Sequence, residues 1–387
     1  MRLGDICDFI NGGTWSDKEY VSSGLPVLKV SNCKTKGFQI EDINCLPLSS
    51  KEKYAKNKLQ LGDVIIATVG SHPNLVESAA GRSYVVNEFV DGFYLNQNAV
   101  CLRTKDNDIL NQTYLGYLCK EHVFVNYIQN KGRGAANQMR IAIGAIKDFE
   151  FGLPDIEVQI QIAKILSTYD KLIENNQKQI KLLEEAAHRL YKEWFVDLRF
   201  PGHEDVEIID GVPEGWIAGT LGNIALFKRG KTITKASIHE GFVPVVAGGL
   251  EPAYYHNKSN TVAPVITVSG SGANAGFVRL YNVDVFASDC SFVDSQSTAY
   301  LYFVYCFLKT NISKMQALQK GSAQPHVYAK DINALELLIP NENLINQFCS
   351  IVTPFFEKIG LLQRQIPQAQ QARDRLLPKL MSDELEV

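Results

Sequence analysis

The sequence has no excess of positive charge, no paired-cysteine motif and no long apolar run. Lys and Arg number 39 against 42 Asp and Glu, so the formal net charge is −3, and the chain as a whole lacks the basic balance typical of nucleic-acid binders. Apolar residues make up 45% and charged residues 21% of the 387 positions, which excludes a disordered or collagen-like chain. At about 100–200 residues per domain, this length predicts two or three domains.

The eight cysteines never form a Cys-x-x-Cys pair, and most have apolar neighbours. We therefore expect buried free thiols in a reducing compartment rather than disulfides or a zinc site. The seven histidines show no metal-ligand spacing. The N-terminus has no apolar signal-peptide core and no apolar run reaches about 18 residues, so we expect a cytoplasmic protein without a membrane partner.

The chain is built from two repeats. Leu-Gly-Asp-Ile at 3–6 returns as Leu-Gly-Asn-Ile at 221–224, and each is followed by a Phe and a Gly at matching positions. A second repeated pair begins at Leu153-Pro154 and at Ile339-Pro340. These repeats predict four segments: a globular domain at 1–152, a helical spacer at 153–200, a second globular domain at 201–340 and a C-terminal helical spacer at 341–387.

Both spacer segments carry the heptad-like spacing of a coiled coil. Apolar residues recur at alternating steps of four and three, and this pattern keeps one stripe of a helix facing a partner helix. We call this stripe the helical seam. Its predicted members are Ile162, Leu166, Tyr169, Ile173, Asn176, Ile180, Leu183, Ala187, Leu190 and Trp194 in the first spacer, and Phe348, Val352, Phe355, Ile359, Leu362, Ile366, Ala369, Arg373, Leu376 and Leu380 in the second.

Two seams of equal length most simply bury each other as an antiparallel pair; the alternative is two amphipathic helices packed on separate cores. Pro367 falls in the middle of the second seam, where we expect it to kink or interrupt the helix, and Pro378 is expected to end it. The globular segments contain short β-branched runs at 26–30, 63–69 and 264–268, and apolar, helix-like runs at 114–119 and 300–307. The predicted fold class is therefore mixed α/β, with two domains in tandem, each followed by a long helix.

No catalytic motif is complete. Lys228-Arg-Gly-Lys-Thr lacks the first glycine of a phosphate-binding loop, and the glycines at 270–276 do not fit a dinucleotide fingerprint. Pro154-Asp-Ile-Glu could suggest a nuclease motif, but its acidic residues suit the first turn of a helix. Asp289-Cys-Ser suggests a nucleophile, but a buried turn is the better interpretation because no histidine is fixed nearby by sequence.

Several segments together resemble a known family. They are Glu-Trp-Phe-Val-Asp at 193–197, Gly-Val-Pro-Glu-Gly-Trp at 211–216, Lys-Gly-Ser-Ala-Gln-Pro-His at 320–326 and Arg-Asp-Arg-Leu-Leu-Pro-Lys-Leu-Met at 373–381. In this order they resemble the specificity subunits of Type I restriction-modification systems, and the resemblance covers essentially the whole chain. The first half departs from the pattern, because it has no Pro-x-Gly-Trp leader and its segment 131–140 lacks Gln-Pro.

The resemblance implies a non-catalytic subunit whose two globular domains each recognise one part of a split double-stranded DNA site. It implies that the helical spacers hold the domains at a fixed separation and dock two methyltransferase subunits, which some systems supplement with a restriction/translocase subunit. No cofactor is expected on this chain, because S-adenosylmethionine and the adenine-N6 chemistry belong to the methyltransferase. The polar helix positions Gln161, Lys164, Asn175, Gln179 and Arg189 become candidate methyltransferase contacts on this basis alone.

Candidate DNA-contacting residues combine positive charge or amide groups with small neighbours that let a duplex approach. They are Lys131, Arg133, Asn137, Gln138 and Arg140 in the first half, and Lys228, Arg229, Lys231, Lys235, Lys320, Ser322, Gln324, His326 and Tyr328 in the second. Because neither half is strongly basic, we expect weak DNA binding by the chain alone. The alternatives are a non-enzymatic coiled-coil scaffold with two protein- or glycan-binding domains, and an autonomous hydrolase using Asp289 or Ser291.

Overall fold

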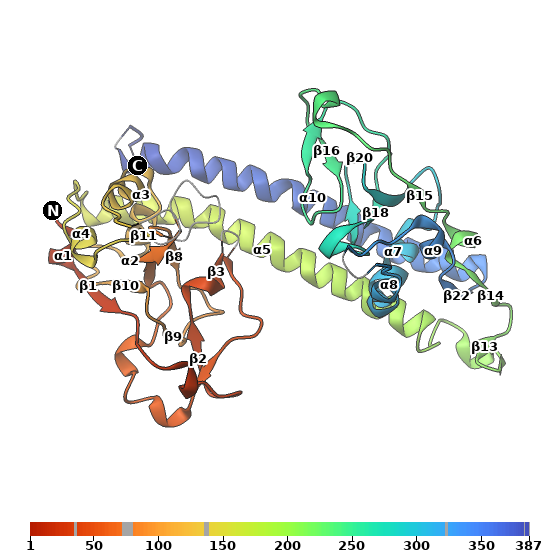
Figure 1. Cartoon of the computed structure of the whole chain (residues 1–387), viewed down its shortest axis with the longest axis horizontal. Helices are drawn as coiled ribbons and strands as arrows, with labels where there is room; N and C mark the ends of the chain where they lie inside the picture. Colours follow the sequence, from red (N-terminus) through yellow and green to blue (C-terminus); the bar gives the residue numbers. More distant parts are fainter. Residues whose placement is uncertain (35–36, 72–79, 135–138, 322–323, 383, 387) are drawn as a thin grey trace. The chain divides into compact units, whose positions relative to one another are not determined.

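A computed structural model describes residues 1–34, 37–71, 80–134, 139–321, 324–382 and 384–386. The chain divides into two compact units, Met1–Leu172 with Ala369–Val387, and Ile173–Gln368. Each unit contains one mixed α/β domain and part of both long helices (Figure 1). The predicted fold class is confirmed. The unit boundaries run through the long helices, and the four-segment division drawn from the sequence stays a prediction.

The first unit is built around a four-stranded antiparallel sheet of order β1-β10-β6-β8 and a three-stranded sheet of order β5-β2-β9. Strand β6 is apolar along its whole length and every residue in it is buried, as expected for a short core strand. The strands are β1 (Cys7–Asn11), β2 (Leu25–Leu28), β3 (Cys33–Lys34), β4 (Gly37–Phe38), β5 (Cys45–Leu46), β6 (Val64–Ala67), β7 (Val69–Gly70), β8 (Ser83–Val85), β9 (Tyr94–Leu95), β10 (Ala99–Thr104) and β11 (Met139–Arg140). The shorter helices are α1 (Leu3–Ile6), α2 (Gln112–Leu118), α3 (His122–Asn130) and α4 (Ile143–Lys147).

The second unit repeats this topology. Its four-stranded sheet has the order β15-β21-β18-β19 and its three-stranded sheet the order β17-β16-β20, with the same parallel and antiparallel pairings as the first unit. The strands are β12 (Ile208–Ile209), β13 (Val212–Pro213), β14 (Ile217–Thr220), β15 (Lys228–Arg229), β16 (Val243–Val246), β17 (Tyr254–His256), β18 (Val265–Ser269), β19 (Val278–Tyr281), β20 (Phe286–Ala287), β21 (Cys290–Asp294) and β22 (Glu336–Ile339). The shorter helices are α6 (Leu221–Ile224), α7 (Leu301–Thr310), α8 (Ile312–Ala317) and α9 (Ala329–Asn333).

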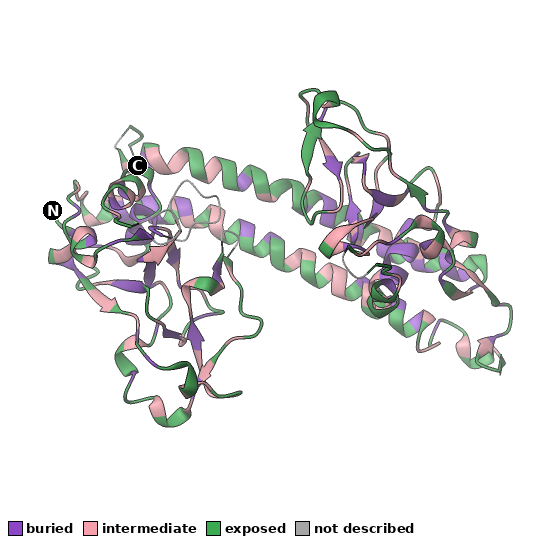
Figure 2. Ribbon diagram, viewed as in Figure 1, coloured by how far each residue is buried: buried purple, intermediate pink, exposed green. Residues whose placement is uncertain are grey.

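The two long helices are α5 (Ile156–Phe195) and α10 (Glu342–Met381), and they pair antiparallel within each unit. In the first unit Asp170 of α5 contacts Arg373 of α10, and in the second unit Asn176 donates a hydrogen bond to Gln365 over 3.2 Å. None of the predicted seam residues is exposed, and buried positions recur along both helices (Figure 2). The expectation of an antiparallel coiled pair is therefore confirmed within the units.

The expectation was that Pro367 kinks or interrupts the second spacer helix; an interruption is wrong, because α10 runs unbroken past this residue, and a kink stays a prediction. Pro378 does not end the helix either, since α10 continues to Met381. Each proline removes one backbone hydrogen bond, and Pro367 is exposed, so its ring lies away from the buried seam. The packing of the seam is continuous on both sides of this position, which explains how the helix tolerates the loss.

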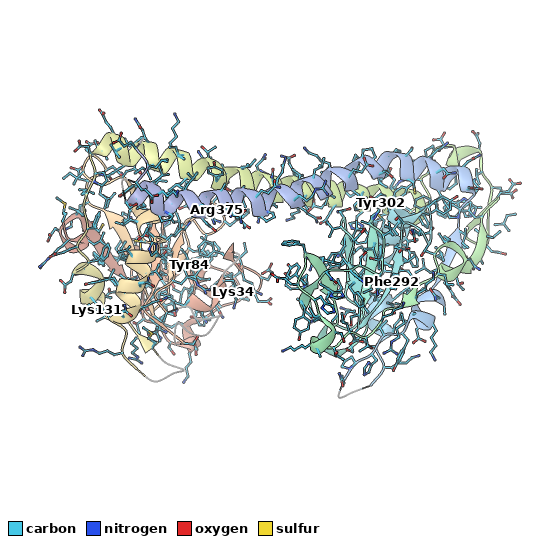
Figure 3. The ribbon with its side chains drawn as sticks, turned by 90° about the horizontal axis from the view of Figure 1, so that it is seen from above. Lys34, Tyr84, Lys131, Phe292, Tyr302 and Arg375 are labelled. Carbon is cyan, nitrogen blue, oxygen red and sulfur yellow. The ribbon has the colours of Figure 1, made fainter. Side chains whose placement is uncertain are left out.

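Both domains pack directly on the long helices. In the second unit the ring of Tyr302 on α7, labelled in Figure 3, stacks on Phe356 of α10, with 4.6 Å between the ring centroids. In the first unit the core includes Ile162 and Leu166 of α5 together with Leu380 of α10. The runs predicted as buried helices at 114–119 and 300–307 correspond to α2 and α7, whose inward faces fill these two cores.

Candidate nucleic-acid interface

The second unit has a polar pocket of about 220 Å³ at the ends of its sheet strands. It lies where β15 and β18 end and β21 begins, because Arg229 is the last residue of β15, Ser271 follows β18 and Asp289 precedes β21. Its polar lining residues are Arg229, Ser271, Asp289, Ser291, Gln324, His326 and Tyr328. The structure thus brings together four residues from two clusters that lie far apart in the sequence: Arg229 from the first, and Gln324, His326 and Tyr328 from the second.

One wall of this pocket is a loop that begins at Lys320 and ends at His326. Lys320 and His326 exchange two backbone hydrogen bonds of 2.9 and 2.8 Å, which close the segment between them. Gly321 has φ +96°, a conformation that a glycine adopts without a steric penalty. The loop is held against the sheet because the backbone N–H of Val327 donates to the carbonyl oxygen of Gly270 over 3.1 Å. Backbone pairing therefore holds His326 and Val327 at the edge of the sheet.

Some polar side chains of the pocket contact one another in pairs. Ser271 donates a short hydrogen bond to one carboxylate oxygen of Asp289. The His326 and Tyr328 rings are stacked, with centroids 6.0 Å apart and an interplanar angle of 16°. Such flat, partly exposed rings suit contact with the sugar or base surfaces of a nucleic acid. The Lys320 ammonium lies outside the pocket, where it donates to Asp331 over 2.8 Å.

The remaining cations predicted in the second half are exposed but do not line this pocket. Lys228 precedes Arg229 on the edge strand β15, so its side chain points to the opposite face of the sheet. Lys231 follows β15, and Lys235 lies over the Tyr254 ring at 5.6 Å from its centroid. These three lysines therefore form no cluster with the pocket residues. Ser322 lies outside the described residues.

In the first unit, the predicted cluster lies on a loop built in the same way. Arg133 and Arg140 exchange backbone hydrogen bonds of 2.9 and 2.8 Å, as Lys320 and His326 do in the second unit. Both arginines are exposed, and Lys131 at the end of α3 lies over the Tyr127 ring at 5.5 Å (Figure 3). Asn137 and Gln138 lie outside the described residues. The two loops correspond although only the second contains Gln-Pro.

A second basic surface was missed in the sequence analysis. In the first unit a pocket of about 620 Å³ along β1 is lined by Lys53, Lys56, Lys58 and Arg103. Arg103 is paired with Asp63 at 2.6 Å and Lys53 with Glu19 at 3.5 Å, whereas Lys56 and Lys58 are exposed. The run Lys51-x-Lys53-x-x-Lys56-x-Lys58 was visible in the sequence, and it could have been identified from its spacing alone.

The segment that could suggest a nucleophile in the sequence is a buried strand. Cys290 and Ser291 are buried in β21, so the segment is a strand rather than the expected turn. Burial raises the pKa of the Cys290 thiol to about 12, which keeps it protonated and unreactive at neutral pH. No group of three His, Cys, Asp or Glu side chains within the described ranges is placed to hold a metal ion. In the same part of the chain, no helix has the length and apolarity needed to span a bilayer.

The two domains share one topology, each carries a polar loop closed by backbone hydrogen bonds, and paired long helices connect them. This arrangement is that of a protein with two recognition domains in tandem. The model of the Type I restriction modification DNA specificity domain matches residues 1–185 and 213–371. The chain therefore belongs to the family of Type I restriction-modification specificity subunits. Specificity subunits are the non-catalytic components of these systems, and two tandem recognition domains fit recognition of a bipartite DNA site.

Relatives with this description match most or all of the chain. The Type I restriction enzyme MjaIX specificity subunit of Methanocaldococcus jannaschii is 29% identical over 71% of this chain and 69% of its own length. The putative MjaX specificity subunit of the same organism is 24% identical over 100% and 93%. A crystal structure of the S subunit of a Type I restriction-modification system from M. genitalium has a TM-score of 0.66 at 18% identity, covering 98% of this chain and 95% of that one. This last likeness supports the fold.

Proposed function

We propose that this chain selects the DNA target of a modification complex, with each globular domain reading one half of a split double-stranded site. The observation that carries the proposal is the repeated loop architecture. Arg133 and Arg140 in one unit, and Lys320 and His326 in the other, fix equivalent loops that are rich in cations and amides. Phosphate contacts from the cations would position the duplex, and the polar side chains near the strand ends would read base edges.

We further propose that the paired helices act as a spacer that sets the gap between the two half-sites. Each helix has 40 residues, or about 60 Å at 1.5 Å per residue. The contacts Asp170–Arg373 and Asn176–Gln365 support a fixed register between the helices within the respective units. A fixed spacer makes recognition sensitive to gap length, because each added base pair also rotates one half-site relative to the other.

The partners in this proposal are two methyltransferase subunits docked on the exposed helix faces and, in systems that have one, a restriction/translocase subunit. The methyltransferase binds S-adenosylmethionine and flips the target adenine out of the duplex. The near-neutral charge of the chain supports this division of labour, since few phosphates can be neutralised by this chain alone. The complex is proposed to act in the cytoplasm, where the cell's DNA lies.

The experiment is expression of the full chain together with its cognate methyltransferase, followed by mapping of methylated adenines. The proposal predicts a bipartite motif with a constant gap, and no methylation of that motif when this chain is omitted. A methyltransferase that modifies the same motif without this chain would contradict it. The coiled-coil scaffold for proteins or glycans predicts no steep salt dependence of DNA binding, whereas specific binding through several phosphates must weaken strongly with salt.

A further inference from the structure

The two domains share a set of equivalent backbone positions around the strand ends, and these positions carry different side chains. The N–H of Gly12 donates to the carbonyl of Ala99 over 3.0 Å, and the N–H of Gly230 donates to that of Cys290 over 2.8 Å. A Cβ at Gly12 would come within 1.9 Å of a backbone oxygen, and one at Gly230 within 2.3 Å. Gly12 at the end of β1 and Gly230 at the end of β15 therefore approach the backbone before the central strand in the same way.

The correspondence extends to the next turn of the chain. The N–H of Thr68 donates to the carbonyl of Asn98 over 2.8 Å, and the N–H of Gly270 donates to that of Asp289 over 3.1 Å. Asn98 and Asp289 thus occupy the same backbone position, immediately before the central strands β10 and β21, although Asn98 has φ +74° and Asp289 does not share this left-handed conformation. The equivalent pairs that follow from these bonds and from the loop pairing are Asn11 with Arg229, Val69 with Ser271, Asn98 with Asp289, and Arg140 with His326.

Asp289 is an unusual residue for a surface that receives DNA. Its carboxylate lines the pocket beside Arg229, Gln324 and His326, where phosphate groups would repel it. Ser271 occupies one oxygen as a hydrogen-bond donor, and no lysine or arginine in the described part of the chain forms an ion pair with it. A carboxylate only accepts hydrogen bonds, so it needs a donor as its partner. The duplex offers donors at base edges, chiefly the exocyclic amines of cytosine and adenine in the major groove.

We propose that Asp289 is a specificity-determining residue that accepts a hydrogen bond from the exocyclic amine of one base in the half-site of the second domain. Asn98 occupies the equivalent place in the first domain, where its amide both donates and accepts, as recognition of adenine requires. Ser271 holds one oxygen of Asp289, and the proposal assigns the other oxygen as the acceptor for the base. The inference rests on the proposed function, because it assumes that this pocket faces DNA.

The test uses the full chain assembled with its cognate methyltransferase and the variants Asp289→Asn and Asp289→Ala. Methylation is measured on duplexes that carry each of the four base pairs at every position of the motif. Asp289→Ala is expected to reduce discrimination at one position of one half-site by roughly five- to hundredfold. Affinity for unrelated DNA should stay equal or rise, because a negative charge has left the interface. Glu336→Gln, an exposed site on β22 outside the pocket, is the matched control and should change neither quantity.

Uniform loss of methylation at all sequences by folded Asp289→Ala, or unchanged discrimination at every position, would overturn this inference while leaving the proposed function intact. Absence of any bipartite motif with the unmodified chain would instead remove the proposed function. Asp289→Asn keeps the shape of the side chain and an acceptor for Ser271, so it serves if the alanine variant unfolds. Where the unmodified chain selects cytosine at that position, the asparagine variant should shift preference toward adenine, and an unshifted preference overturns the inference. Where it selects adenine, the asparagine variant should keep that selection, and its loss overturns the inference.

Discussion

The guanidinium of Arg373 lies 2.5 Å from the carboxylate of Asp170, joining α10 to α5 inside the helical seam. The same carboxylate accepts a hydrogen bond of 2.6 Å from the hydroxyl of Tyr117 on α2. Burial and the neighbouring Asp170 raise the pKa of Tyr117, so its hydroxyl remains a donor across the accessible pH range. Asp170 therefore links both long helices to the first globular domain through one side chain.

Replacing Asp170 by Ala should lower the free energy of unfolding by about 1–3 kcal/mol, because it leaves the buried Tyr117 hydroxyl without its acceptor and removes one of the two carboxylates that pair with the half-buried Arg373 guanidinium. Chemical denaturation of the full chain measures this loss. Asp374→Ala removes a carboxylate that also pairs with Arg373 but is 62% exposed, and it should cost less. Equal losses in the two variants would show that the link to Tyr117 contributes nothing.

The stability of the chain should fall in mild acid because of His188. Burial, followed by the nearby Lys309, lowers the pKa of His188 to about 4 from an ordinary value of 6.5. The unfolded chain thus binds more protons than the folded one, so stability present above pH 6.5 is lost as the pH falls toward 4. For this partly buried ring the loss is about 1–3 kcal/mol after allowance for screening. The melting temperature of the His188→Leu variant should fall less between pH 6.5 and 4 than that of the unmodified chain, and equal falls would contradict this assignment.

Native thiols should react slowly with alkylating reagents at pH 8. Six of the eight free cysteines are buried, and burial raises the pKa of Cys7, Cys33 and Cys290 to about 12 in each case. Half-buried Cys45 should be modified first, and all eight should react once the chain is denatured. Mass spectrometry after timed iodoacetamide treatment measures the order, and rapid native labelling of Cys290 would contradict the burial of β21.

The loop of the first domain should contribute to DNA affinity through charge. Removing both Arg133 and Arg140 is expected to reduce the slope of log affinity against log salt by about two, since each phosphate contact contributes about one. The loss should be similar across sequences if these side chains contact phosphates. Lys178→Ala on the exposed face of α5 is the control, because it removes a cation far from either loop along the chain. An unchanged slope in the double variant would exclude phosphate contacts by these arginines.

The elements with strong periodicity were predictable from the sequence. The steps of four and three identified both long helices and their buried seam, and the repeat at 3–6 and 221–224 identified the duplicated domains. Pro367 misled the prediction, because local propensity was overridden by packing along α10. Composition cannot show that kind of compensation, since it depends on what lies on the opposite face of the helix.

The pocket was only partly predictable, because its residues come from segments far apart in the chain. Arg229 and His326 were expected on charge and polarity, but nothing in the sequence placed them beside each other. In the sequence, Asp289 is prominent only as part of the Asp-Cys-Ser segment that suggests a nucleophile. Its equivalence to Asn98 follows from backbone hydrogen bonds, which sequence patterns do not contain.

The central claim is that two domains read two half-sites across a fixed spacer. The most direct measurement is the methylation rate of the assembled complex on duplexes in which the gap of the mapped motif is lengthened or shortened by one and by two base pairs. The account predicts a steep loss of rate at every altered gap, with both half-site sequences kept intact. Rates that stay equal across these gap lengths would contradict it.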